Sequence, residues 1–191
     1  MRIGIDIDNV ILETDEVLLE EFLKEDKNKR NKGIINKDLY LMSGMFDWSK
    51  EEIDEFLHIN MENIAKNLKP KENAKYYIDK LLNEGHEIYL ISNRSTKQYT
   101  NAFETTTNNL KDNEINYTKL IITETNDKSS ACLENNIDVM IDDRPSNCFK
   151  LIDKNIKCIL FKSKYEKRVF DEFDVINNWD ELYILLNKMT K

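Results

Sequence analysis

The stretch MRIGIDIDNVI, residues 1–11, decides the fold, because it begins as a strand and ends in acidic residues. Residues 2–7 form a short, largely apolar run that is rich in β-branched side chains, which is typical of a strand buried within a sheet. Asp6 and Asp8 then stand one residue apart where the strand ends. Because carboxylates this close repel each other, the pair indicates a polar site at the end of the first strand.

Four similar apolar runs follow along the chain. They read EIYLIS (87–92), KLIIT (119–123), DVMID (138–142) and KCILF (157–161). Most of them are separated by amphipathic stretches of helix length. Strands that alternate with helices predict an α/β fold, here a Rossmann-like parallel sheet with helices on both faces.

A proline and a glycine mark the two ends of one predicted helix. The apolar stripe of AKYYIDKLL, residues 74–82, predicts a helix that precedes the second strand. Pro70 is expected in the first turn of this helix, and Gly85 is expected to cap its end. This arrangement is typical of the junction between a helix and the next strand of a parallel sheet.

A second helix is expected over residues 49–68, where Ser49 and Glu52 form a capping-box pattern. It lies in residues 13–68, an interval with helical patterns but no convincing strand. We therefore expect a helical insertion after the first strand. The expected division is a core of residues 1–12 and 69–191 and an inserted unit of residues 13–68.

Composition limits the classes of function. The 191 residues are 40% hydrophobic and 34% charged, which fits one globular domain with an inserted subdomain. The net charge of -8 argues against a nucleic-acid polymer or an anionic membrane as partner. Cys132, Cys148 and Cys158 are widely spaced, which indicates free thiols. Without a leader-peptide pattern or a spanning apolar run, we expect a soluble, cytoplasmic protein.

Polar residues gather at the carboxyl ends of the predicted strands, where open parallel sheets bind ligands. They are Asp6, Asp8, Ser92, Asp142 and Asp143. Four carboxylates at one edge would be driven toward protonation unless a cation sat among them. Mg²⁺ prefers oxygen ligands and is the expected cofactor. Lys128, before the fourth strand, is placed to add positive charge.

In this order, these residues resemble the haloacid dehalogenase superfamily of phosphotransferases. IGIDIDNVI matches its first motif, Asp-x-Asp-x-Thr/Val, with Val10 in the last place. IYLISNRS matches the second motif, a strand that ends in Ser or Thr. Lys128 in NDKSS matches the third, and the acidic pair in VMIDDRPSN matches the fourth. The resemblance spans the chain from the first strand to about Phe161.

The resemblance implies a phosphatase mechanism. Asp6 would attack phosphorus to form an aspartyl-phosphate, and Asp8 would act as general acid and base. Mg²⁺ would be held by Asp6, by the backbone carbonyl of Asp8 and by Asp142, with Asp143 contacting it directly or through water. The phosphoryl oxygens would be held by Ser92, Asn93 and Lys128.

Each assignment has a structural alternative. An Asp pair at a strand end is commonly a turn or helix-cap feature, and Ser92 could cap the following helix. Lys119 and other surface lysines compete with Lys128. Arg94 could contact the phosphate or lie exposed in a loop. Asn147 could support the metal site or face solvent on a helix.

Within the superfamily, these motifs look most like the branch of the 5'(3')-deoxyribonucleotidases and their bacterial relatives. That branch commonly has Thr-Ala-Arg where this chain has Ser92, Asn93 and Arg94. The inserted residues 13–68 occupy the position of the superfamily's small cap. There, Tyr40, Phe46 and Trp48 could stack on a base or form the core of the cap.

Three functions remain open from the sequence. The first is a Mg²⁺-dependent phosphatase for a small phosphomonoester, with a (deoxy)nucleoside monophosphate as the expected substrate of a 5'-nucleotidase. The second is a phosphatase for sugar phosphates or another small metabolite. The third is a binding protein that keeps the fold without catalysis, and the complete motif series counts against it.

Overall fold

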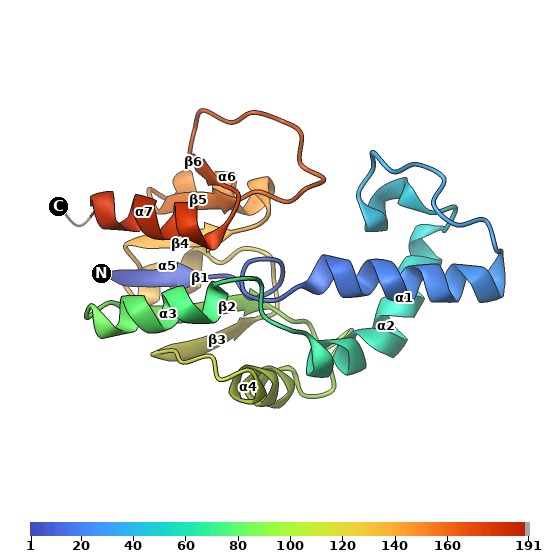
Figure 1. Cartoon of the computed structure of the whole chain (residues 1–191), viewed down its shortest axis with the longest axis horizontal. Coiled ribbons are helices and arrows are strands. Elements are labelled where there is room, and N and C mark those ends of the chain that lie inside the picture. The colour runs from blue at the N-terminus through green and yellow to red at the C-terminus, as the bar shows by residue number, and fades with distance from the viewer. Residues whose placement is uncertain (190–191) are drawn as a thin grey trace.

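The computed structural model describes residues 1–189 and contains a six-stranded parallel sheet of order β3-β2-β1-β4-β5-β6 (Figure 1). The five predicted strands and the α/β class are confirmed. A sixth strand, β6, pairs with β5 at the sheet edge and was not predicted. The strands are β1 (Arg2–Ile5), β2 (Glu87–Asn93), β3 (Lys119–Thr123), β4 (Val139–Asp142), β5 (Lys157–Phe161) and β6 (Asp174–Ile176).

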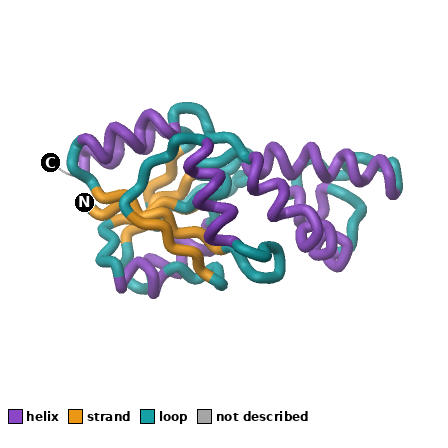
Figure 2. Tube along the Cα trace, turned by 90° about the horizontal axis from the view of Figure 1, so that it is seen from below, coloured by secondary structure: helices purple, strands orange, loops and turns teal. Residues whose placement is uncertain are grey.

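Helices cover both faces of the sheet (Figure 2). One apolar cluster joins Ile3 and Ile5 of β1 to α3 (Ala74–Asn83), α4 (Ala102–Asp112) and α7 (Trp179–Met189). A second cluster joins the opposite side of the strands to α5 (Ser129–Glu134) and α6 (Pro145–Ile152). Alternate residues of each strand therefore point to opposite faces, as the period of a strand requires.

Gly4 of β1 leaves room for the side chain of Met140 on β4, on the side of the sheet that carries α5 and α6. A Cβ atom at Gly4 would lie 2.7 Å from the sulfur atom of Met140. A side chain at this position would therefore require the flexible end of Met140 to shift. Both of these strands carry site residues at their carboxyl ends.

Helix α3 ends as predicted, but it begins later than predicted. Gly85 has φ of 85° and follows the helix. Its N–H donates to the carbonyl of Leu82, and the N–H of His86 donates to that of Leu81. Pro70 is not in the first turn, because residue 70 forms a bridge with Leu12 four residues before α3 begins.

Three helical elements follow β1 and extend beyond the carboxyl edge of the sheet (Figure 1). They are α1 (Thr14–Lys29), the kinked helical turn η1 (Leu41–Met45) and α2 (Lys50–Asn67). The predicted capping box is confirmed, since Ser49 and Glu52 exchange side-chain and backbone hydrogen bonds. The centre of this unit is an aromatic cluster of Phe22, Phe46, Trp48 and Phe56.

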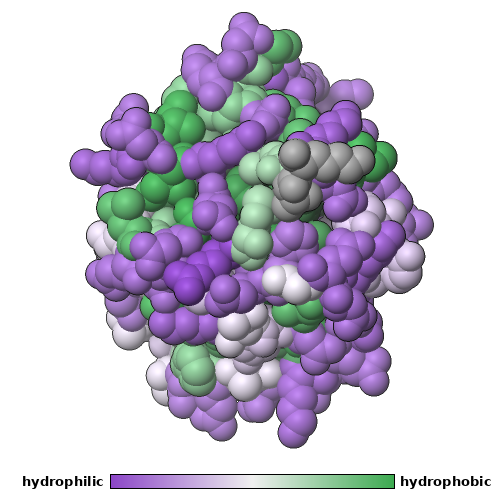
Figure 3. All heavy atoms as spheres, turned by 90° about the vertical axis from the view of Figure 1, so that its left-hand side faces the viewer, coloured by the Kyte–Doolittle hydropathy of each residue, from purple (hydrophilic) through white to green (hydrophobic). Residues whose placement is uncertain are grey.

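The opposite end of the molecule, where the strands begin, is mostly hydrophilic (Figure 3). Apolar side chains appear there only in small, separate patches. No helix among residues 1–189 is long and apolar enough to cross a membrane. Cys132, Cys148 and Cys158 are buried free thiols, as predicted.

Candidate active site

A cavity of about 520 Å³ lies at the carboxyl edge of the sheet, between the strand ends and the inserted helices. Its lining contains most of the residues that the sequence singled out. From the sheet side these are Asp6, Asp8, Ser92, Asn93, Lys128, Asp143 and Asn147. The parallel strands bring them together because β1, β2 and β4 are neighbours and end at the same edge.

Lys128 lies at the centre of this cluster and is only 2% exposed. Its Nζ is 2.9 Å from Oδ1 of Asp6 and 2.7 Å from Oδ2 of Asp142. Lys128 immediately precedes α5, whereas Asp6 directly follows β1 and Asp142 ends β4. A single ammonium group therefore bridges the two central strands.

Asp142 is fully buried and held from several directions. The amide of Asn147 donates to both of its carboxylate oxygens, at 3.0 and 3.2 Å. The backbone N–H of Arg144 donates to Oδ1 at 2.9 Å. Because Asn147 lies on α6 and directly contacts Asp142, it fixes the carboxylate's orientation.

Negative charge exceeds positive charge at this edge. Oxygen atoms of Asp6, Asp142 and Asp143 lie within 4.8 Å of one another. Burial raises the pKa of Asp6 to about 6, against the opposing charge of Lys128 and with help from Asp142 and Asp8. Burial and the charges of Asp142 and Asp6 raise the pKa of Asp143 well above its ordinary value, against the opposing charge of Arg144. A cation among these oxygens would relieve this repulsion, and carboxylates suit a hard divalent ion.

Asp8 faces the cavity from the loop after β1, and its side chain is 22% exposed. Its Oδ1 accepts hydrogen bonds from the hydroxyl of Thr14 at 2.8 Å and from Arg94 at 3.1 Å. Its Oδ2 lies 3.4 Å from the hydroxyl of Ser92. Arg94 is 1% exposed, so it is not a loop arginine that faces solvent. It is also not among the residues that line the cavity.

A family model for "5' nucleotidase, deoxy (Pyrimidine), cytosolic type C protein" matches residues 1–190. The chain belongs to this family. It is therefore a phosphatase of the nucleotidase class, and its fold is that of haloacid dehalogenase-type hydrolases. A search of curated proteins gave no match.

Solved structures of the superfamily share the fold of this nucleotidase. A haloacid dehalogenase family hydrolase from Deinococcus radiodurans, with bound phosphate and sodium, has a TM-score of 0.71 at 10% identity, covering 99% of this chain and 96% of that one. A hydrolase of the superfamily from Geobacter sulfurreducens has a TM-score of 0.65 at 11% identity, with coverages of 97% and 95%. CbbY from Rhodobacter sphaeroides, in complex with xylulose-1,5-bisphosphate, has a TM-score of 0.59 at 12% identity, with coverages of 95% and 95%.

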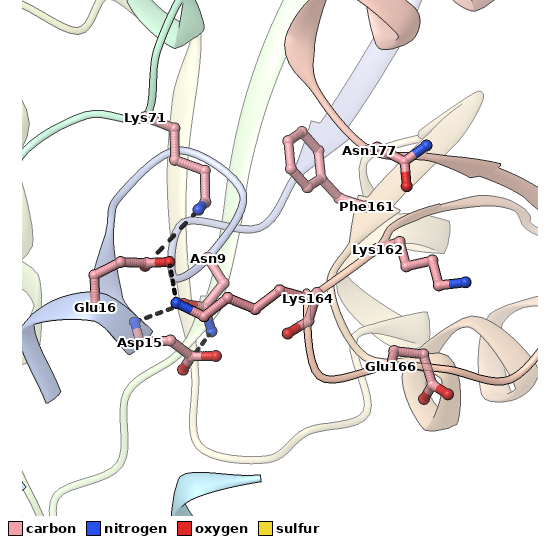
Figure 4. Close-up of a pocket in the computed structure, with 10 residues that line it drawn as sticks. Asn9, Asp15, Glu16, Lys71, Phe161, Lys162, Lys164, Glu166 and Asn177 are labelled. Atoms are coloured by element: carbon pink, nitrogen blue, oxygen red, sulfur yellow. Dashed lines mark hydrogen bonds and ion pairs between the residues drawn. The ribbon is translucent and has the colours of Figure 1, made fainter. Parts of the chain in front are cut away.

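The nucleotidase also contains a hydrogen-bonded chain that the sequence did not reveal. Asn9 donates to Asp15 at 3.1 Å and accepts from the N–H of Asp15 (Figure 4). It also donates to Asp143 at 3.0 Å. The hydroxyl of Tyr40 donates to Asp15 at 2.9 Å. The chain thus joins the inserted unit to the acidic cluster. Asn9 has φ of 62°, a conformation that asparagine tolerates better than most residues. The presence of an asparagine directly after Asp8 was therefore the signal that the sequence offered.

A second cavity, of about 400 Å³, shares Asn9 and Asp15 with the first (Figure 4). Two lysines reach into it, and Glu16 lies between them. The Nζ of Lys164 is 3.1 Å from a carboxylate oxygen of Glu16, and that of Lys71 is 4.0 Å away. The lining holds three acidic residues, Asp15, Glu16 and Glu166, and three lysines, Lys71, Lys162 and Lys164, so its formal charges balance.

The structure brings only one of the three aromatic candidates to the nucleotidase cavity. Tyr40 lines it, whereas Phe46 and Trp48 are 2% and 8% exposed within the inserted unit. They pack against Phe22, and the indole N–H of Trp48 donates to Asp26. Of the two alternatives for Phe46 and Trp48, stacking on a base or forming the core of the cap, the structure shows the core, which is where a small helical unit needs its largest rings.

Proposed function

We propose that this nucleotidase is a Mg²⁺-dependent phosphomonoester hydrolase that forms an aspartyl-phosphate on Asp6. The observation that carries the proposal is the bridge from Lys128 to Asp6 and Asp142, with Asp8 beside it at the same cavity. The bridge fixes one oxygen of Asp6 through Lys128 and the N–H of Ile7. It leaves Oδ2 of Asp6 for attack on phosphorus.

The proposed reaction has two steps. Asp6 forms a bond to phosphorus while the bond to the leaving oxygen breaks, and Asp8 gives a proton to that oxygen. Asp8 then takes a proton from water, which attacks phosphorus and releases phosphate from Asp6. The hydroxyl of Ser92, the amide of Asn93 and Lys128 bind the phosphoryl oxygens and stabilise charge as it builds.

The acidic cluster fits a magnesium ion. Asp6, Asp142 and Asp143 would hold it with their carboxylates, together with the backbone carbonyl of Asp8. When bound, the ion neutralises the phosphate and lowers its repulsion of the attacking carboxylate. Asn147 and Asn9 orient Asp142 and Asp143 for this role through their amide donors.

We further propose that residues 13–68 act as a cap that selects a (deoxy)nucleoside monophosphate. The family description names a deoxynucleotide activity, and a cytoplasmic location goes with that description. Beside the polar residues Thr14, Asp15, Tyr40, Lys50 and Asp54, the inserted unit contributes an apolar surface to the cavity lining. It consists of Leu18, Met42, Leu57 and Met61. Such a surface suits a flat nucleobase better than a hydroxyl-rich sugar, because hydroxyl groups would lose water there without gaining partners.

The test is phosphate release from nucleoside 5'- and 3'-monophosphates, sugar phosphates and p-nitrophenyl phosphate, with Mg²⁺ or EDTA. We expect Mg²⁺-dependent turnover with a preference for deoxynucleotides. Asp6→Asn should lower kcat by ~10³-fold or more without unfolding the chain, because it removes the nucleophile.

Asp153→Asn is the matched control, since Asp153 is exposed at the end of α6 and should keep wild-type rates. Wild-type turnover by Asp6→Asn would end the nucleophile assignment. Undiminished activity in EDTA would end the metal assignment. A preference for sugar phosphates would overturn the substrate class while leaving the chemistry in place.

A further inference from the structure

Arg94 is the largest charged side chain in the interior of this protein. It follows β2 directly, its N–H donates to the carbonyl of Thr123 at 3.2 Å, and it is 1% exposed. Arginine is almost never this buried unless it is paired, because a charge removed from water must recover its solvation from partners. The identity of its partners therefore indicates what the residue does.

The guanidinium group has one acidic partner, Asp8. Nη2 of Arg94 is 3.1 Å from Oδ1 of Asp8. Its carbon lies 5.3 Å from the ring centre of Tyr99, which is 4% exposed and supplies a cation–π contact. Nε and Nη1 have no hydrogen-bond partner among the described residues. Because burying the guanidinium group removes it from water, we expect its function to lie in the ion pair with Asp8.

The two carboxylate oxygens of Asp8 are held differently. Oδ1 accepts from both Arg94 and Thr14, at 3.1 and 2.8 Å. Among residues 1–189, Oδ2 has only the long contact of 3.4 Å with the hydroxyl of Ser92. Turning the carboxylate away from this orientation would break both short hydrogen bonds. The oxygen that remains available to a substrate is therefore Oδ2.

We propose that Arg94 is a positioning residue that clamps Oδ1 of Asp8, so that Oδ2 carries the proton to and from the leaving oxygen. This inference rests on the proposed role of Asp8 as general acid and base. Arg94 does not line the cavity, whereas Tyr99 and Ser92 do, so the guanidinium acts through Asp8 and not on the phosphate. It differs in this from Lys128, which does line the cavity.

Two substrates that differ in whether the leaving group needs a proton can test whether Arg94 positions Asp8. The leaving oxygen of a nucleoside monophosphate departs as an unstable alkoxide unless that oxygen is protonated. By contrast, p-nitrophenyl phosphate releases a stable phenolate. We expect Arg94→Met to lower kcat for the nucleotide by about 10- to 100-fold. The first-turnover burst of p-nitrophenol should change less than about threefold, because that step needs little acid catalysis. KM should stay close to the wild-type value for both substrates.

Two further variants complete the test. Thr14→Val removes the other donor to Oδ1 and should give the same pattern with a smaller loss. Arg94→Lys keeps the charge but cannot offer the same planar donor, so it should also lose nucleotide turnover. These two variants provide the measurement if Arg94→Met does not fold, as judged by its thermal unfolding.

Equal losses on both substrates, or a raised KM, would overturn the inference in favour of phosphate binding or a purely structural role. Asp8→Asn separates this inference from the proposed function. If Asp8→Asn turns over the nucleotide normally, the acid–base assignment fails. If Asp8→Asn is inactive while Arg94→Met and Thr14→Val are not impaired, only the positioning role fails.

Discussion

Lys128 shows how strongly a single residue can matter at this site. Burial alone would lower the pKa of its ammonium group, but the charges of Asp142 and Asp6 outweigh burial and raise it. The lysine therefore stays charged, and its positive charge compensates both carboxylates. Two buried acids thus depend on one ammonium group for their compensation.

We expect Lys128→Met to lower the free energy of unfolding by about 3–5 kcal/mol in EDTA, because it leaves Asp6 and Asp142 buried without their partner. It should also abolish phosphate release, because the phosphoryl oxygens lose a cation. Urea unfolding at neutral pH, with MgCl₂ or EDTA, measures the first effect.

Lys119→Met is the matched control. Lys119 is an exposed lysine at the start of β3, and its Nζ donates only to Asn135. Its loss should change the free energy of unfolding by less than about 0.5 kcal/mol. Equal stabilities of the two variants would show that the bridge to the two carboxylates does not stabilise the fold.

Residue types and strand order were sufficient to predict where Asp6, Ser92 and Lys128 lie, because parallel strands end at one edge. The sequence could not predict the clamp on Asp8. Thr14 and Arg94 reach it from different elements, and only the folded chain shows that both contact the same oxygen. Sequence spacing alone left Arg94 open between a phosphate contact and an exposed loop position.

At the scale of elements, Glu62 joins the inserted helix α2 to the start of α4. Its carboxylate accepts hydrogen bonds from the N–H groups of Thr100 and Asn101, both at 3.1 Å, and from the hydroxyl of Thr105 at 2.9 Å. The N–H donors of Thr100 and Asn101 hold the pKa of Glu62 at about 2. An acidic group is also favourable beside a helix N-terminus.

Because its folded pKa is depressed, Glu62 stabilises the fold when ionised and loses this effect as the pH falls from its ordinary value of 4.5 toward about 2. We expect Glu62→Gln to lower the free energy of unfolding by about 1–2 kcal/mol at neutral pH. The difference from wild type should shrink steadily at acid pH. Chemical denaturation across this pH range provides the measurement.

Glu55→Gln is the control on the same helix, because Glu55 is exposed. It should change stability little at any pH. A difference between Glu62→Gln and wild type that stays constant down to pH values near 2 would contradict the role of the ionised carboxylate.

Elements with a full hydrophobic period were predictable, and short or irregular ones were not. β6 has only three residues, too few for an alternating pattern to be recognised. Pro70 suggested a first turn, but α3 begins after Asn73, which adopts the left-handed conformation with φ of 62°. Backbone turns of this kind depend on how the incoming chain pairs, here residue 70 with Leu12.

At the scale of the whole molecule, the acidic cluster lies at the middle of the sheet. Asp6 follows β1 and Asp142 ends β4, the two central strands, so only the folded chain brings them together. The four carboxylates at this edge, Asp6, Asp8, Asp142 and Asp143, face three cations, Lys128, Arg94 and Arg144. A bound divalent ion should therefore stabilise the whole fold and not only a loop.

We expect saturating MgCl₂ to raise the Tm of the wild type by about 5–10 °C relative to EDTA, since binding at about a hundredfold excess over Kd adds roughly 2.7 kcal/mol.

Asp143→Asn should gain stability in EDTA and lose most of the stabilisation by Mg²⁺. In EDTA it should be more stable than wild type by about 1 kcal/mol, because one crowded charge is gone, and its Mg²⁺-induced shift should fall by more than half. Calorimetry at constant ionic strength, with Asp153→Asn as control, measures both. An Asp143→Asn variant that is destabilised in EDTA and keeps the full shift would contradict a metal site at this edge.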